Sequence, residues 1–306
     1  MRYLRSLITV AALLPSIAAS QSSRTQIVML GTGTPIPDPD RSGPAVAIVV
    51  DSTAYLFDAG TGVVRRAAAA GRNGVRAFAG RTSAQPSPRF DRVFLTHLHS
   101  DHTLGLADVI FTPWIQGRRT PLDIYGPPGT SHLVNSILDG YSEDIAERLS
   151  ASGGPSPDGW KATVHEIVPG IVFQDSRITV RAFPVLHAGW KYAFGYRIET
   201  PDRTIVISGD TRATSKVDEQ CRGCDVLIHE VYSDSGFATL PPERQIYHAQ
   251  AHTSATQLGD IATRARPGLL ILNHQLFFGS TEEKLLSEVR SHFSGKVVSA
   301  HDLDVY

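Results

Sequence analysis

The sequence predicts an α/β protein in which two mixed β-sheets pack face to face and helices cover their outer faces. Short apolar runs rich in β-branched residues, bounded by Gly and Pro, occur in both halves of the chain. Segments with helical apolar spacing lie between these runs. Because strands are gathered in both halves with helices between them, a four-layer sandwich with two central sheets is favoured.

The first half of the chain contains four strand candidates and one helix candidate. The strands are predicted over residues 26–30, 45–50, 55–57 and 92–96. The Ala-rich run 63–70 stops at Gly71, as a short helix does. Residues 80–88 are polar and contain proline, which predicts a loop. The last of the four strands leads directly into a group of histidines.

The second half repeats this pattern of strands and helices. Strands are predicted over residues 178–183, 193–198, 204–208, 226–229 and 269–273, and helices over 252–264 and 281–292. The helical region 130–152 is interpreted as an insertion or a lid. Since no break in composition divides residues 21–306, we expect them to form one hydrolase domain.

The overall charge gives little support to a polyanionic partner. The 306 residues include 29 basic and 30 acidic side chains, and 42% of all residues are hydrophobic. This composition is ordinary for a globular protein with a buried core. The formal net charge of -1 predicts no broad basic surface, so nucleic acid is disfavoured as a partner.

The N-terminal segment resembles a secretory signal. Arg2 and Arg5 precede an apolar run over residues 7–14, and small residues follow up to Ser20. This run is shorter than the roughly 20 residues of a membrane-spanning helix. A signal peptide over residues 1–20, cleaved before Gln21, is therefore predicted, with an uncleaved tether as the alternative. We expect a periplasmic or secreted protein that leaves the membrane after cleavage, either monomeric or homodimeric.

Cys221 and Cys224, the two cysteines, form a C-x-x-C pair. No second pair accompanies them, which disfavours a structural zinc site. In an oxidising compartment a local disulfide is preferred, with two buried free thiols as the main alternative.

The strongest chemical signal is the segment Thr96–His102, which contains three histidines and one aspartate. In an extended chain, residues two apart point the same way, so His97 and His99 can meet one ion together. Asp101 and His102 follow immediately and can face a second ion beside the first. Imidazole and carboxylate ligands without thiolates suit Zn²⁺ or another borderline divalent metal. The spacing therefore predicts a metal centre.

This H-x-H-x-D-H run resembles the hallmark of the metallo-β-lactamase superfamily. The chain is most similar to its tRNase Z branch and to exported arylsulfatase-like and phosphodiesterase-like relatives. Further matching segments are Gly31–Pro35, Phe57–Gly60, Tyr125–Thr130, Ser208–Thr211 and Ile228–Glu230. The resemblance implies a first site of His97, His99 and His187, a second of Asp101, His102 and His274, and Asp210 bridging both.

The resemblance also implies how such a centre works. Two Zn²⁺ ions, with Mn²⁺ or Fe²⁺ as alternatives, would lower the pKa of a bridging water so that it attacks as hydroxide. Asp101 would help to offset the cationic charge and orient the water. His252 matches a tRNase Z histidine that resembles a general acid, and Glu230 would orient it.

We expect a small phosphodiester or aryl sulfate ester as the substrate. Bacterial tRNase Z carries a long tRNA-gripping arm between two strands, whereas here residues 199–204 leave room only for a tight turn. A β-lactam or lactone hydrolase is the alternative enzyme, and a non-catalytic binding module is the alternative from another class. Trp190 and Tyr247 can either line a pocket or pack in the core, and His229 and His248 are interpreted as structural or exposed.

Overall fold

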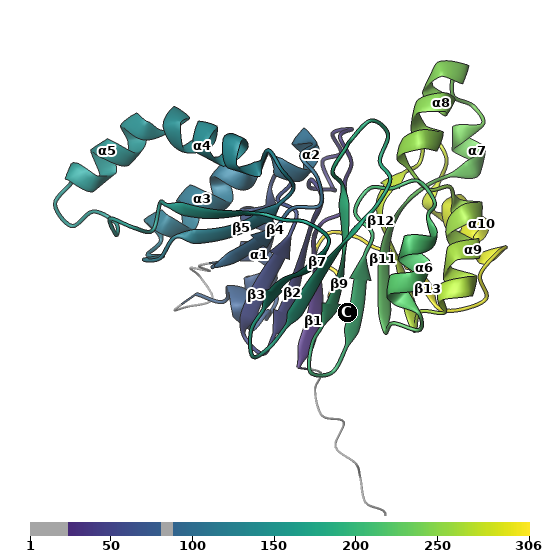
Figure 1. Ribbon diagram of the computed structural model, residues 1–306, viewed down its shortest axis with the longest axis horizontal. Helices are drawn as coiled ribbons and strands as arrows, with labels where there is room; N and C mark the ends of the chain where they lie inside the picture. The colour runs from purple at the N-terminus through teal and green to yellow at the C-terminus, as the bar shows by residue number, and fades with distance from the viewer. Residues whose placement is uncertain (1–23, 81–87) are drawn as a thin grey trace, which may run out of the picture.

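The computed structural model describes residues 24–80 and 88–306, which form two packed β-sheets flanked by helices (Figure 1). The first sheet has six strands: β1 (Thr25–Gly31), β2 (Ala45–Val50), β3 (Thr53–Phe57), β4 (Arg92–Phe94), β5 (Leu122–Gly126) and β6 (Ala162–Glu166). The second has seven: β7 (Gly170–Gln174), β8 (Thr179–Pro184), β9 (Phe194–Glu199), β10 (Thr204–Ile207), β11 (Val226–Tyr232), β12 (Leu269–Leu276) and β13 (Val297–Ser299).

Both sheets are mixed, as the sequence predicts. In the first sheet, β1–β2 and β2–β3 are antiparallel, whereas the strands from β3 to β6 are parallel. In the second, β10 to β13 are parallel and β7 to β10 pair antiparallel. The parallel strands of each sheet therefore end at a common edge, where residues distant in sequence are brought together.

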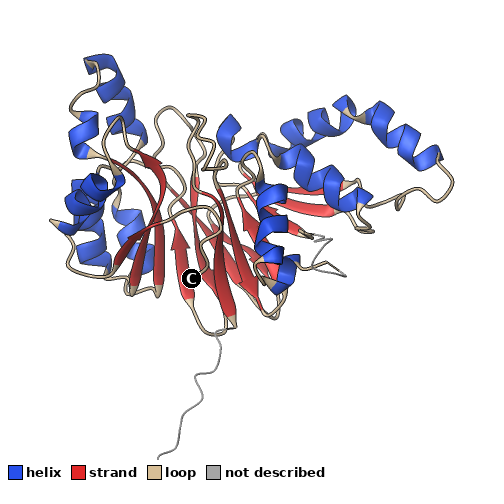
Figure 2. Cartoon of the chain, turned by 180° about the vertical axis from the view of Figure 1, so that it is seen from behind, coloured by secondary structure: helices blue, strands red, loops and turns tan. Residues whose placement is uncertain are grey.

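Helices cover the outer faces of the two sheets (Figure 2). Their bounds are α1 (Val63–Arg72), α2 (Ser100–Thr103), α3 (Leu106–Ile115), α4 (Thr130–Gly140), α5 (Ser142–Ser150), α6 (Ser215–Cys221), α7 (Asp234–Phe237), α8 (Pro242–Ala251), α9 (Ala255–Ala265) and α10 (Glu282–Arg290). Helices α1 and α3 pack on the first sheet, and α6, α9 and α10 pack on the second. The predicted αββα sandwich is confirmed.

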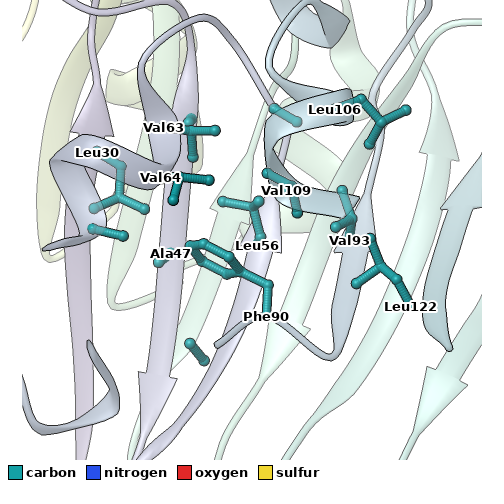
Figure 3. Close-up of a cluster of buried hydrophobic side chains, with 14 of the residues drawn as sticks. Leu30, Ala47, Leu56, Val63, Val64, Phe90, Val93, Leu106, Val109 and Leu122 are labelled. Carbon is teal, nitrogen blue, oxygen red and sulfur yellow. The ribbon is translucent and has the colours of Figure 1, made fainter. Parts of the chain in front are cut away.

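Strand β1 shows how side chains that alternate between the two faces of a sheet contribute to two different core clusters. Val28 and Leu30 point into the cluster under α1 and α3, whereas Ile27 and Met29 point into the cluster between the sheets. Successive strand residues face opposite sides of a sheet, so a fully buried strand reads as a continuous apolar run. Figure 3 shows the outer cluster, where Leu30 and Leu56 of the sheet meet Val63 and Val109 of the helices.

One helix begins later than predicted. The expected helix over residues 252–264 is α9, which begins at Ala255 because Ser254 caps it. The Ser254 hydroxyl accepts a hydrogen bond from the Gln257 N–H, and the Gln257 side chain accepts one from the Ser254 N–H. This capping box fixes the boundary and leaves His252 and Thr253 in the connection after α8.

The region 130–152 consists of two helices rather than one, since the chain turns at Tyr141 between α4 and α5. Helix α4 packs beside β6, and neither helix lines the cavities found around the histidine cluster in the described part of the chain. The contact of α4 with β6 therefore fits the insertion, and a role as a lid stays a prediction. The expected loop over residues 80–88 and the signal over residues 1–20 fall largely or wholly outside the described residues.

Two further expectations concern the cysteines and the membrane. Cys221 at the end of α6 forms a disulfide with Cys224, so the preferred pairing is confirmed. Among the helices of residues 24–80 and 88–306, none is both long and apolar enough to cross a bilayer.

Candidate metal centre

The first metal-ligand candidates meet where β4 ends and where β8 ends, on opposite sheets. His97 and His187 are buried, and His99 is partly exposed. The Nδ1 atom of His99 lies 3.0 Å from Nε2 of His97 and 3.0 Å from Nε2 of His187. Three ring nitrogens therefore converge on one point, and a carboxylate oxygen of Asp210 lies within 4.8 Å of them.

A second group lies beside the first. The short helix α2 turns the chain so that Asp101 and His102 face His274 of β12. Oδ2 of Asp101 is 3.2 Å from Nε2 of His274 and 3.5 Å from Nε2 of His102. The consecutive residues of one short segment thus serve two adjacent positions.

Asp210 lies between the two groups. Its Oδ2 atom is 4.0 Å and 3.9 Å from the Nε2 atoms of His97 and His187. The same oxygen is 3.5 Å from Nε2 of His102 and 3.5 Å from Nε2 of His274. A single carboxylate oxygen faces two imidazoles from each group, which is the position that a bridging ligand needs.

The local backbone conformation orients the side chains of Asp210 and His274. Gly209, before Asp210, has φ +60°, and a Cβ atom there would lie 2.7 Å from the carbonyl oxygen of Phe194. His274 has φ 44° and is the extra residue of a bulge between β11 and β12. Bulges re-aim side chains and concentrate at functional sites, and a non-glycine residue in this conformation is strained. Both features therefore direct ligand candidates into the cluster.

Neighbouring groups fix which ring nitrogen each histidine presents. Nδ1 of His102 donates to Asp58, 2.9 Å away, and Nδ1 of His187 donates to the carbonyl oxygen of Ala251, 2.8 Å away. Asp58 also accepts hydrogen bonds from the N–H and hydroxyl of Thr96. Such partners hold the tautomer in which Nε2 is free to bind a metal.

The donor set fits a divalent cation. Nε2 of His102 is buried without a hydrogen-bond partner although it faces two carboxylates. Burial lowers the pKa of His97 well below its usual value and that of His99 to about 4, which keeps both rings in the neutral form that binds metals. Histidine and carboxylate ligands without sulfur are typical of zinc and similar ions.

His252 and Glu230 form a buried pair at the edge of the cluster. Nδ1 of His252 lies 3.2 Å from Oε2 of Glu230, whose other oxygen accepts N–H bonds from Thr253 at 2.8 Å and Thr211 at 3.3 Å. Burial lowers the pKa of His252 to about 4 and raises that of Glu230. The imidazole is thus neutral at neutral pH, with Nε2 as its free nitrogen.

All predicted site residues are therefore close together. The position of His252 beside two ligand candidates fits a general acid and also a metal ligand. His252, Asp210 and His274 can each offer a ligand atom within 4.8 Å of the others. Proximity alone does not separate a general acid from a ligand, so both assignments stay predictions.

A cavity of about 270 Å³ opens beside the cluster. Its walls include Ile36, Arg244, Tyr247, His248 and Phe278 together with cluster residues. Tyr247 lines this cavity, and His248, which the sequence had suggested was structural or exposed, lines it too. The sequence offered no signal for Arg244.

Trp190 contacts the cluster and also packs against the core on the helix-covered side of the second sheet. Its indole N–H donates to Nε2 of His99, 2.6 Å away, and its ring lies edge-on to that of His97. Trp114, in contrast, is buried in α3 and donates to the carbonyl oxygen of Ser156.

Comparison with known proteins agrees with this geometry. Residues 53–275 match the family model described as β-lactamase superfamily domain. The chain is 33% identical to Ribonuclease Z of Mycobacterium bovis (strain BCG / Pasteur 1173P2) over 286 residues, covering 91% of this chain and 96% of the relative. Ribonuclease Z of Mycobacterium marinum is 32% identical with the same coverage.

Solved structures give the same fold. The metallo-β-lactamase fold protein YhfI from Bacillus subtilis has a TM-score of 0.66 and 20% identity, covering 93% of this chain and all of that protein. The short form of human tRNase Z has a TM-score of 0.64 and 23% identity, covering 92% and 98%.

The chain belongs to the metallo-β-lactamase superfamily of hydrolases. Within that superfamily it is a tRNase Z-like protein. The resemblance inferred from the H-x-H-x-D-H run is confirmed.

Proposed function

We propose that this protein is a metal-dependent phosphodiesterase that acts on small substrates. The single observation that carries the proposal is Asp210, whose Oδ2 atom faces both histidine groups while the His252–Glu230 pair lies at their edge. The similarity to Ribonuclease Z relatives supports phosphodiester cleavage over the other ester chemistries of the fold.

The donor set supports two divalent cations, most naturally zinc, with Mn²⁺ or Fe²⁺ as alternatives. His97, His99 and His187 would hold one, and Asp101, His102 and His274 the other, with Asp210 shared. When bound, such cations supply an activated water and stabilise the negative charge that develops on the ester oxygens. Protein supplied with zinc and then freed of excess should contain about two ions per chain by elemental analysis, and fewer than one would contradict this assignment.

The residues of the chain would handle the proton. Hydrolysis adds water across the P–O ester bond, so the leaving oxygen must gain a proton. His252 would act as the general acid that gives the leaving oxygen this proton from its free Nε2, and because burial keeps the ring neutral at rest, it would take the proton up during turnover. Glu230 would position the ring through its contact with Nδ1 of His252.

A tight turn supports a small substrate. Strand β9 ends at Glu199 and β10 begins at Thr204, and the Thr200 N–H donates to the carbonyl oxygen of Arg203 within the turn. No arm leaves this part of the chain, and the formal net charge of -1 adds no general attraction for a polyanion.

A substrate panel tests the reaction class. We expect the zinc-loaded protein to hydrolyse bis-p-nitrophenyl phosphate faster than p-nitrophenyl sulfate, nitrocefin or a homoserine lactone. Faster turnover of the sulfate would make the enzyme an arylsulfatase, and faster turnover of nitrocefin or the lactone would make it an amide or lactone hydrolase. Stable metal binding without any turnover would favour the non-catalytic module.

We also propose that residues 1–20 are a cleaved secretory signal. The basic start and the apolar run over residues 7–14 support export. N-terminal sequencing of the protein expressed from its full reading frame should begin at Gln21, and an intact Met1 in the cytosolic fraction would contradict export.

A further inference from the structure

One face of helix α8 forms part of the cavity wall and extends away from the cluster. Arg244, Tyr247 and His248 are spaced so that they share this face, and His252 follows one turn after His248. All four residues line the 270 Å³ cavity. Figure 1 shows α8 at the upper edge of the second sheet, the same edge of the molecule at which α2 lies. This face of α8 therefore extends the wall of the cavity from the metal centre towards the solvent.

The inner part of this face is aromatic. The rings of His248 and Phe278 lie with their centroids 4.6 Å apart, and the ring of Tyr247 lies 5.1 Å from that of His248. Tyr247 lines the cavity together with residues of the cluster. Burial raises the pKa of its hydroxyl, and the carboxylates Asp210 and Asp101 add to the shift. Flat apolar walls of this kind bind planar rings.

The outer part of the face is cationic. Arg244 is exposed, and none of the ion pairs found in the described part of the chain includes it. Eight positions separate it from His252, which is about 12 Å along a helix axis. A guanidinium group presents parallel N–H donors that match the oxygens of a phosphate.

We propose that this face of α8 selects phosphodiesters that carry a planar ring and a second phosphate. The scissile phosphate lies at the metal centre, the ring lies against Tyr247 and Phe278, and the second phosphate binds Arg244. The inference rests on the proposed function, because it assumes that a phosphodiester occupies the metal centre.

Two substrates that differ only in the distal anion test this selectivity. Thymidine 5′-(p-nitrophenyl phosphate) has the reacting group and the ring, and its 3′-phosphorylated form adds the second phosphate with the same leaving group. We expect zinc-loaded wild-type protein to prefer the 3′-phosphorylated form by about 10- to 100-fold in kcat/KM, mainly through KM, since one charged hydrogen-bonding pair is at stake.

The Arg244→Gln variant should lose most of this preference, and Arg244→Lys should keep part of it because a point charge remains. Arg72→Gln is the matched control, since Arg72 is an exposed arginine at the end of α1. It should retain the wild-type preference. Equal kcat/KM for the two substrates in wild type, or a preference that survives in Arg244→Gln, would overturn the proposal.

Equilibrium binding separates failure of the proposal from failure of the proposed function. Calorimetry on the zinc-loaded protein should show tighter binding of thymidine 3′,5′-bisphosphate than of thymidine 5′-phosphate, and Arg244→Gln should abolish the difference. If neither diester is hydrolysed but this difference appears, the phosphodiesterase assignment fails and the α8 site stands. If the diesters are hydrolysed and the two nucleotides bind equally, the α8 site fails alone.

Discussion

The two sheets deliver their side chains to the metal centre in different ways. The first sheet supplies its ligand candidates from one run, His97 to His102, which leaves β4 and turns through α2. The second sheet supplies Asp210, Glu230 and His274 from the ends of three separate parallel strands, β10, β11 and β12. A local run is visible from spacing alone, whereas residues on separate strands meet only because parallel strands end at one edge.

Among the residues that the second sheet supplies from separate strands, we expect Asp210 to have the largest effect on turnover, because it faces both groups. Asp210→Ala should remove measurable turnover, because its oxygen faces imidazoles of both groups. His274→Ala should leave weak activity, because it disturbs only the second group. Steady-state kinetics with elemental analysis of each variant measures this order. Equal residual turnover with unchanged metal content in both variants would contradict a bridging role.

The next effect concerns His252, which lies outside both ligand groups in our assignment. His252→Ala should slow esters with poor leaving groups by about 100- to 10,000-fold, since those leaving oxygens need a proton. Activated p-nitrophenyl esters should lose much less, and the metal content should stay near that of wild type. A uniform loss across a leaving-group series, together with lost metal, would instead make His252 a ligand and would remove the positioning role of Glu230.

A smaller effect is expected from substitution of Asp58, which forms a hydrogen bond with His102 and so orients this ligand candidate. Asp58→Asn keeps the shape of the side chain but replaces the carboxylate that accepts from Nδ1 of His102. Partners of metal-binding histidines typically contribute about 10- to 100-fold in metal affinity. Chelator competition should show a weakening of this size. Asp123→Asn is the control, because Asp123 contacts His165 on the far strands of the sheet, and a similar loss there would point to a general effect of charge.

The same contrast explains what the sequence could predict. The strands with continuous β-branched runs, such as β2 and β10, were placed within a residue, because a strand buried on both faces leaves that pattern. Helix α3 was missed because its residues are apolar on nearly every side and include Pro113, which hides the helical period.

Helix α8 was missed for the opposite reason. Its residues are mostly polar and only Ala251 is buried, so it shows no apolar stripe. Arg244 went unnoticed with it and His248 was interpreted as structural or exposed, because a helix that faces a cavity instead of a core leaves no periodic signal. Asp58 was visible only as part of the segment Phe57–Gly60, and its role became clear from its contact with His102.

The last prediction concerns stability and another difference between the sheets, since the second sheet fully buries His229, which is not one of the ligand candidates. Its Nδ1 donates to the carbonyl oxygen of Glu230, and burial lowers its pKa from 6.5 to about 4. Between these two values the unfolded chain binds more protons than the folded one, so stability falls as the pH drops from 6.5 towards 4. For this one residue the loss between pH 7.5 and 5 is about 2 kcal/mol. Urea unfolding in the presence of a chelator should show a loss smaller by about that amount in His229→Leu. The exposed His132 gives the control His132→Gln, which should match wild type, and an unchanged pH dependence in His229→Leu would show that another group carries the acid sensitivity.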